Sequence, residues 1–149
     1  METNLLVQLI DQKHEVLVQL HQLAQRQLAF VGEGGEMSEL LSLLAAKQGL
    51  LDRLHALQRQ LDPYRREDPD SRRWRTPRDR QRCAQVAGRC QSLLGEVIEL
   101  ERRSEAQLKL RRDSTAAQLK AVSTAAEARA AYTAGPCESQ GQLDLTSET

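Results

Sequence analysis

The sequence has few aromatic residues, no long apolar run and no net charge, and each absence narrows the possible classes of protein. Phe, Trp and Tyr make up 3% of the 149 residues, whereas strands are rich in aromatic and β-branched side chains. No stretch approaches the ~18 apolar residues of a membrane span. Lys and Arg together number 21, as do Asp and Glu, so no overall charge attracts nucleic acid or anionic lipid. We therefore expect neither a nucleic-acid partner nor membrane insertion.

Cysteine is also scarce, and its spacing does not suit a disulfide framework. Cys83 and Cys90 are seven residues apart on one predicted helix, which separates them by about 10 Å. That distance is too long for a disulfide bond, and Cys137 is far from both in sequence. The first 15 residues carry acidic side chains and lack the layout of a signal peptide. These features favour reduced thiols and a cytoplasmic location.

Residues that perform catalysis or bind metals are scattered. His14 and His21 are also about 10 Å apart along a helix, too far to share a metal ion, and no Cys-x-x-Cys motif occurs. The motif GEGGE, residues 32–36, has no predicted strand before it and no Lys-Ser/Thr after it, both of which a phosphate-binding loop requires. We therefore expect no enzyme activity, no metal and no cofactor.

Leucine at helical spacing is abundant instead. Apolar residues recur every three or four positions over residues 4–31 and 36–61, which predicts two amphipathic helices. Glycines at 32, 34 and 35 form a turn between them, so the pair should be an antiparallel hairpin. Pro63, Pro69 and Pro77 interrupt the helical pattern. Thr76-Pro77 then resembles an N-cap followed by proline in the first helical position. A third helix is predicted over residues 77–133.

The predicted fold class is all-α, with a helical hairpin and a long third helix in one domain of residues 1–133. The two hairpin helices should be roughly 40 Å long and the third helix roughly 80 Å. The third helix therefore outlasts the hairpin, and residues 101–133 are predicted to form a C-terminal helical overhang. Gly135-Pro136 should end it, and the polar residues 134–149 are predicted to be a disordered tail.

A helical wheel gives residues 108–132 two apolar stripes on opposite sides. The first stripe contains Leu108, Thr115, Leu119, Val122, Ala126 and Ala130. The second contains Leu110, Ala117, Ala121, Ala125, Ala128 and Tyr132. We expect a helix with two opposed apolar stripes to pack against a neighbour on each side. The alternative is a solvated, alanine-rich helix that is helical by propensity alone.

The loop before the third helix is rich in arginine, with eight arginines and five acidic residues in residues 62–82. Tyr64 and Trp74 offer aromatic faces on which bases could stack, as in single-strand binding proteins. In the alternative, which we favour, Trp74 covers the open end of the bundle while the arginines pair with the interleaved acids.

The hairpin resembles the FlgN-type flagellar export chaperones. In that family a glycine–acid pair, leucines, a lysine and paired leucines open the second helix. The segment GEMSELLSLLAAKQGLLDRL matches this run at Gly35, Glu36, Leu40, Leu43, Leu44, Lys47, Leu50, Leu51 and Leu54. Tyr132-Thr133-Ala134-Gly135 is similar to the aromatic residue and glycine near the end of the family's last helix. The resemblance extends over roughly residues 1–133, and the arginine-rich loop with Trp74 departs from it.

The resemblance implies a cytoplasmic chaperone for type III protein export in bacterial flagellum biogenesis. Its cargo would be the C-terminal helical segments of hook–filament junction proteins, that is, hook-associated proteins. The two stripes of residues 108–132 would bind this cargo, and Tyr132 would dock on the cytoplasmic domain of the export gate. One alternative is a structural coiled-coil protein whose free chains pair as homodimers through residues 101–133. Another is nucleic-acid binding through the arginine-rich loop.

Overall fold

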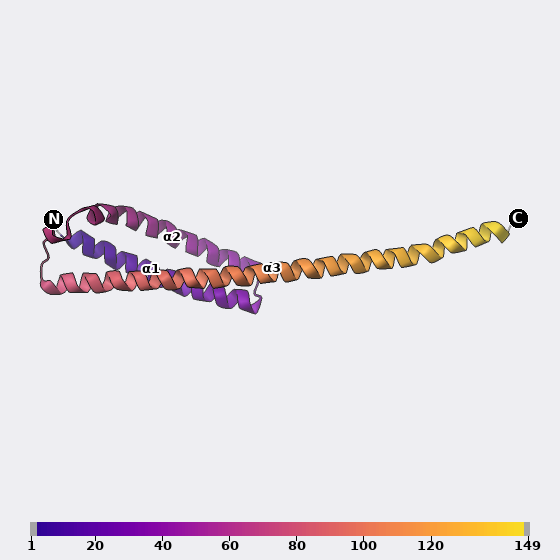
Figure 1. The fold of residues 1–149 in the computed structure, drawn as a ribbon, viewed down its shortest axis with the longest axis horizontal. Coiled ribbons are helices and arrows are strands. Elements are labelled where there is room, and N and C mark those ends of the chain that lie inside the picture. The colour runs from indigo at the N-terminus through magenta and orange to yellow at the C-terminus, as the bar shows by residue number, and fades with distance from the viewer. Residues whose placement is uncertain (1–2, 148–149) are drawn as a thin grey trace. The chain divides into compact units, whose positions relative to one another are not determined.

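Three α-helices and one short 3-10 helix form the described part of the chain (Figure 1). The structure is a computed structural model that describes residues 3–147, and for residues 134–147 it gives the helix without side chains. The elements are α1 (Asn4–Glu33), α2 (Met37–Arg66), η1 (Pro69–Ser71) and α3 (Pro77–Ser147). No strand occurs among the described residues, which confirms the all-α prediction and the long third helix.

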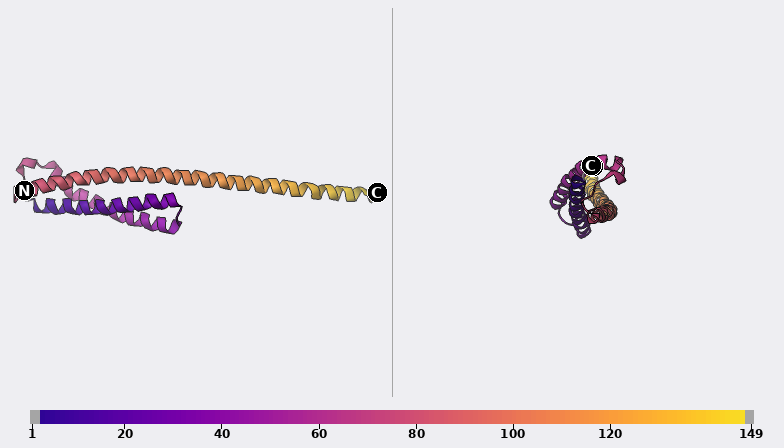
Figure 2. Two further views of the ribbon diagram at one scale, coloured as in Figure 1. Left: turned by 90° about the horizontal axis from the view of Figure 1, so that it is seen from below. Right: turned by 90° about the vertical axis from the view of Figure 1, so that its left-hand side faces the viewer.

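The chain divides into two compact units, Met1–Gln107 and Leu108–Thr149. In the first unit α1 and α2 lie side by side as an antiparallel hairpin (Figure 2). The first part of α3 packs on this hairpin and runs parallel to α1. An ion pair, Asp11–Arg82 at 3.7 Å, and a close contact between His21 Nε2 and the Glu96 carboxylate at 3.0 Å join those helices. In the second unit the structure describes helix alone.

The core of the first unit forms where the leucine stripes of the helices meet. Helix α1 contributes most of it, and Val16 and Leu17 are fully buried. Burying such a side chain contributes about 1.5–3 kcal/mol, so packing of this stripe is a main source of the bundle's stability. The buried cluster consists of Leu6, Leu9, Val16, Leu17, Leu20, Leu54, Leu57, Leu61, Cys90 and Val97.

Glycines set the geometry of the hairpin turn, as the sequence predicts. Helix α1 includes Gly32 and ends at Glu33, and Gly34 takes the left-handed conformation with φ 73°. The backbone N–H groups of Gly34 and Gly35 both donate to the carbonyl oxygen of Phe30, the latter at 3.3 Å. A Cβ atom on Gly35 would collide with the ring of Phe30. The turn therefore requires glycine at 34 for its backbone angle, and a side chain at 35 would displace the partly exposed ring of Phe30.

The proline-containing segment differs from its predicted form at one end. Helix α2 continues through Pro63 to Arg66, whereas the sequence predicts an end at residue 61. Pro63 removes a single hydrogen bond, the one to the carbonyl of Arg59, and the helix ends within one further turn. At the start of α3, the N–H of Asp79 donates to Thr76 Oγ1 at 3.2 Å, which confirms the predicted N-cap.

The far end of α3 also differs in its bounds. The helix continues to Ser147, past Gly135-Pro136, where the sequence predicts its end. The side chains of residues 134–149 lie outside those that the structure describes. The predicted disordered tail of residues 134–149 therefore stays a prediction.

Candidate functional site

The predicted cargo-binding residues all lie on α3, in its segment 108–133. Leu108 is half-buried, and every side chain from Lys109 to Thr133 is exposed. Leu110, Leu119 and Val122 are 63%, 66% and 67% exposed, and Tyr132 is 80% exposed. The largest apolar side chains of this segment therefore remain available to a partner.

Because the segment is continuous helix, the two predicted stripes keep the spacing that the wheel gives them. Their polar neighbours bond locally. Thr124 Oγ1 donates to the carbonyl of Lys120, and Thr133 Oγ1 to that of Arg129, both at 2.9 Å. These hydroxyls are thus engaged within one turn of their own helix. Apart from Thr115, the two stripes themselves consist of alanine methyl groups and a few larger side chains.

Small side chains make this surface suitable for another helix. Alanine at half of the stripe positions lets a partner's backbone approach closely, while Leu119 and Val122 provide larger anchors. Burying a Leu or Val side chain contributes about 1.5–3 kcal/mol, so a few such residues supply an appreciable part of a binding energy. The arrangement offers a surface for apolar helix–helix packing.

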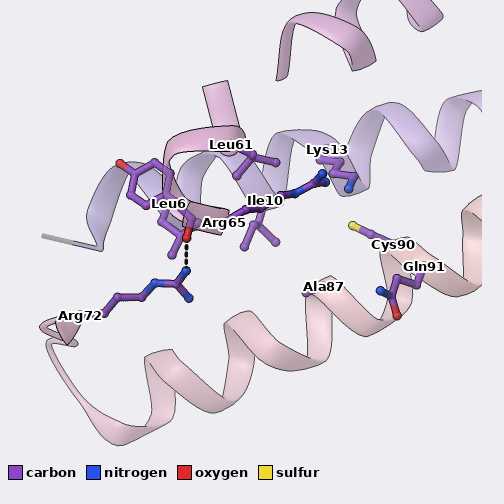
Figure 3. Close-up of a pocket in the computed structure, with 10 residues that line it drawn as sticks. Leu6, Ile10, Lys13, Leu61, Arg65, Arg72, Ala87, Cys90 and Gln91 are labelled. Atoms are coloured by element: carbon purple, nitrogen blue, oxygen red, sulfur yellow. Dashed lines mark hydrogen bonds between the residues drawn. The ribbon is translucent and has the colours of Figure 1, made fainter. Parts of the chain in front are cut away.

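The arginine-rich loop makes part of the contacts that the favoured interpretation predicts, since Arg65 and Arg72 pair with the interleaved acids Asp62 and Glu67. Trp74 is partly buried and packs against the core. Arg72 Nε donates to Glu67 at 2.7 Å, and its guanidinium also donates to the carbonyl oxygen of Tyr64 at 2.6 Å (Figure 3). The pair is largely shielded from water, because the Arg72 and Glu67 side chains are 19% and 12% exposed. Trp74 and Arg72 thus help to cover the end of the bundle at which α1 begins and α2 ends.

Lys47 has a structural role that sequence reasoning missed. It is buried on α2, where its Nζ donates to Gln27 Oε1 of α1 at 2.7 Å and pairs with the carboxylate of Glu101 on α3. One side chain therefore links all three helices. The signal was in the spacing, since Lys47 lies seven residues from both Leu40 and Leu54 and so falls on the buried face of α2.

Cys83 and Cys90 are buried free thiols on α3. Burial raises the pKa of both thiols, because it penalises the charged thiolate. Asp11 adds to the rise, whereas Arg72 partly offsets it at Cys83 and Lys13 partly offsets it at Cys90. Both thiols therefore favour the protonated form, which is the less reactive one, at neutral pH. Within the described residues, no cluster of three His, Cys, Asp or Glu side chains is placed to hold a metal ion.

The helices described in this chain include none with the length and apolar character needed to cross a membrane.

Comparison with protein-family models, with curated proteins and with solved structures found no match to this chain. The FlgN-type resemblance consequently rests on the residues quoted above.

Proposed function

We propose that this chain is a cytoplasmic export chaperone of the FlgN type. It binds the C-terminal helical segments of hook-associated flagellar proteins and delivers them to the type III export gate. The observation that supports this proposal most directly is the exposure of two apolar stripes on residues 108–133 of α3. A chaperone that keeps a helical segment unassembled needs such a surface, because it must replace the packing that the segment finds in the finished filament.

The binding mode is helix against helix on both sides of α3. Leu108, Leu119 and Val122 anchor one cargo helix. Leu110 anchors the other, and the alanines between the anchors allow close approach. Burial of apolar area at roughly 25 cal/mol per Å² drives the association.

A double charge substitution tests the cargo site. Leu119→Asp/Val122→Asp should abolish binding to a cargo's C-terminal helical fragment in calorimetry, because two unpaired carboxylates would be buried at the interface. The thermal unfolding midpoint should not change, because both positions are exposed. A control, Gln118→Asp/Lys120→Asp, places two carboxylates on the polar edges and also removes one ammonium, and it should retain binding. Normal binding by the first variant would refute this cargo site.

Tyr132 has a separate role in the proposal, namely docking on the cytoplasmic domain of the export gate. A tyrosine offers a large apolar face, few rotors and one hydroxyl to a partner's pocket. Tyr132→Ala should leave cargo affinity nearly unchanged and weaken binding to the gate domain. Calorimetry against each partner decides this, and equal losses for both partners, or for neither, would remove the distinction.

Self-association is the rival use of the same stripes. Light scattering on the purified chain, with and without the cargo fragment, separates the two. A chaperone should form a complex with cargo, even if the free chain is a dimer. A dimer that ignores cargo would instead support a structural coiled-coil protein.

A further inference from the structure

Two adjoining hollows lie in the first unit, at the end of the bundle where α1 begins and α2 ends. The larger, of about 230 Å³, has walls from all three helices, including Leu6 and Ile10 of α1, Leu61 of α2 and Ala87 of α3 (Figure 3). The smaller, of about 200 Å³, shares Leu6, Ile10 and Ala87 and adds Trp74. Both volumes exceed the ~30 Å³ that one water occupies and fall below the ~300 Å³ of a typical drug site. A small ligand would fit.

The charged lining of these hollows is of one sign. Lys13, Arg65 and Arg72 line the larger and Arg72 and Arg80 the smaller, and neither lining includes an Asp or Glu. Arg72 is already neutralised by Glu67, and Arg65 approaches Asp62 only at 3.9 Å. Lys13 is half-buried, and no ion pair to it occurs among the described residues. Across the hollow, the Cys90 side chain points from α3 toward Lys13 (Figure 3).

A partly apolar hollow that contains one cation without an ion pair among the described residues, Lys13, suits one ligand chemistry. Two like charges on one lining repel each other, and an anion between them removes that repulsion. The apolar walls favour a hydrocarbon body. We propose that the hollows form a binding site for a small amphiphilic carboxylate, whose apolar chain contacts Leu6, Ile10 and Ala87 and whose carboxylate pairs with Lys13. The site is independent of the stripes on residues 108–133.

Trp74 reports on the site directly, since it is the chain's single tryptophan and lines the smaller hollow. Octanoate should change its fluorescence saturably in the full-length protein. Octanol, with the same chain and no charge, should bind about tenfold more weakly, and octylammonium more weakly still, because a charge-assisted hydrogen bond contributes about that factor.

Two variants separate the contribution of the Lys13 charge to ligand affinity from that of the hollow. Lys13→Gln should weaken octanoate about tenfold while leaving octanol unchanged. Ala87→Leu should weaken both ligands because it fills the hollow, and circular dichroism verifies that each variant is folded. Arg129→Gln, an exposed charge outside the first unit, should have no effect. Equal affinity for octanoate and octanol, no effect of Lys13→Gln, or no saturable signal with octanoate would each overturn the proposal.

Discussion

Residues 1–107 and residues 108–133 use the same helical spacing of apolar residues with opposite results. In the first region Leu17 is fully buried against the other helices, whereas in the second Leu119 is 66% exposed. Some apolar residues of the first region are exposed too, but they flank a buried face of the same helix. From Lys109 to Thr133 no side chain is buried. An amphipathic pattern thus indicates that a face is suited to burial, without saying what covers it.

The two regions also differ in what keeps them helical. The bundle relies on tertiary packing of leucine, which is the usual source of helix stability in proteins. The segment 108–133 instead contains many strong helix formers, among them Ala, Leu, Gln, Lys and Arg. High helix propensity can stabilise such a helix without tertiary packing on its apolar stripes. That difference suits a segment that packs only when a partner arrives.

Truncating one leucine in each region should give the largest contrast. Leu17→Ala should lower the free energy of unfolding by about 2–5 kcal/mol, because it leaves a cavity in a fully packed core. Leu119→Ala should change it by less than about 0.5 kcal/mol. Urea denaturation followed by circular dichroism measures both. Similar losses for the two variants would mean that Leu119 belongs to a core after all.

The link between the helices through Lys47 gives the next largest expected effect. Lys47→Met should lower the free energy of unfolding by about 1–3 kcal/mol, since it leaves Gln27 and Glu101 without their shared partner. The loss should be smaller than for a fully buried pair, because the Glu101 side chain is 38% exposed. Lys120→Met, at an exposed position, is the matched control and should be nearly neutral. A Lys47 variant as stable as that control would show that the link contributes nothing.

Much of the fold was predictable because each element carries a local signal. Glycines at 34 and 35 marked the hairpin turn, Thr76-Pro77 marked the start of α3, and leucine spacing marked the buried faces. A proline was a less reliable signal for the end of a helix, because a helix tolerates proline near its C-terminus. Helix α2 accordingly continues past Pro63. The exposure of Leu119 and Val122 followed from comparing helix lengths.

Features that depend on several helices were not predictable in the same way. The partners of Lys47 lie 20 residues before it and 54 residues after it in the chain, so only the packed bundle reveals them. The hollow beside Lys13 likewise requires the relative positions of α1, α2 and α3. The spacing of Lys47 from Leu40 and Leu54 is a signal for its burial that sequence reasoning did not use, and only the tertiary structure shows which groups neutralise it.

Two glycines in the hairpin should respond with opposite signs when changed to alanine. Gly34→Ala should destabilise the protein by about 1 kcal/mol, because position 34 has φ 73°. Gly32→Ala should stabilise it by about 0.5–1 kcal/mol, because Gly32 lies inside α1 and its added Cβ meets open space. Thermal denaturation of both variants measures the difference. The same sign for both would contradict the turn geometry described here.

Thiol reactivity compares buried positions of the first region with an exposed position of the second, and the substitutions that it needs should change stability least. In a Cys137→Ser background, Cys83 and Cys90 should react slowly with iodoacetamide at neutral pH, because burial raises the pKa of each thiol. Ala121→Cys, at an exposed position of the second region, should react at least about tenfold faster.

The pH dependence of stability follows from the same two thiols. Because folding raises the thiol pKa, the folded state favours the protonated thiol more than the unfolded state does. The resulting contribution to the free energy of unfolding is fully present below the pKa of the unfolded thiol. It is lost as the pH rises through the pKa of the folded thiol. The free energy of unfolding should therefore decline slightly at alkaline pH. Cys83→Ala/Cys90→Ala should flatten that decline, as measured by urea denaturation at several pH values. Rapid alkylation of Cys83 and Cys90 in the folded protein would mean that these thiols are not held in the core. The same conclusion would follow if the double variant lost stability at alkaline pH as steeply as the original protein.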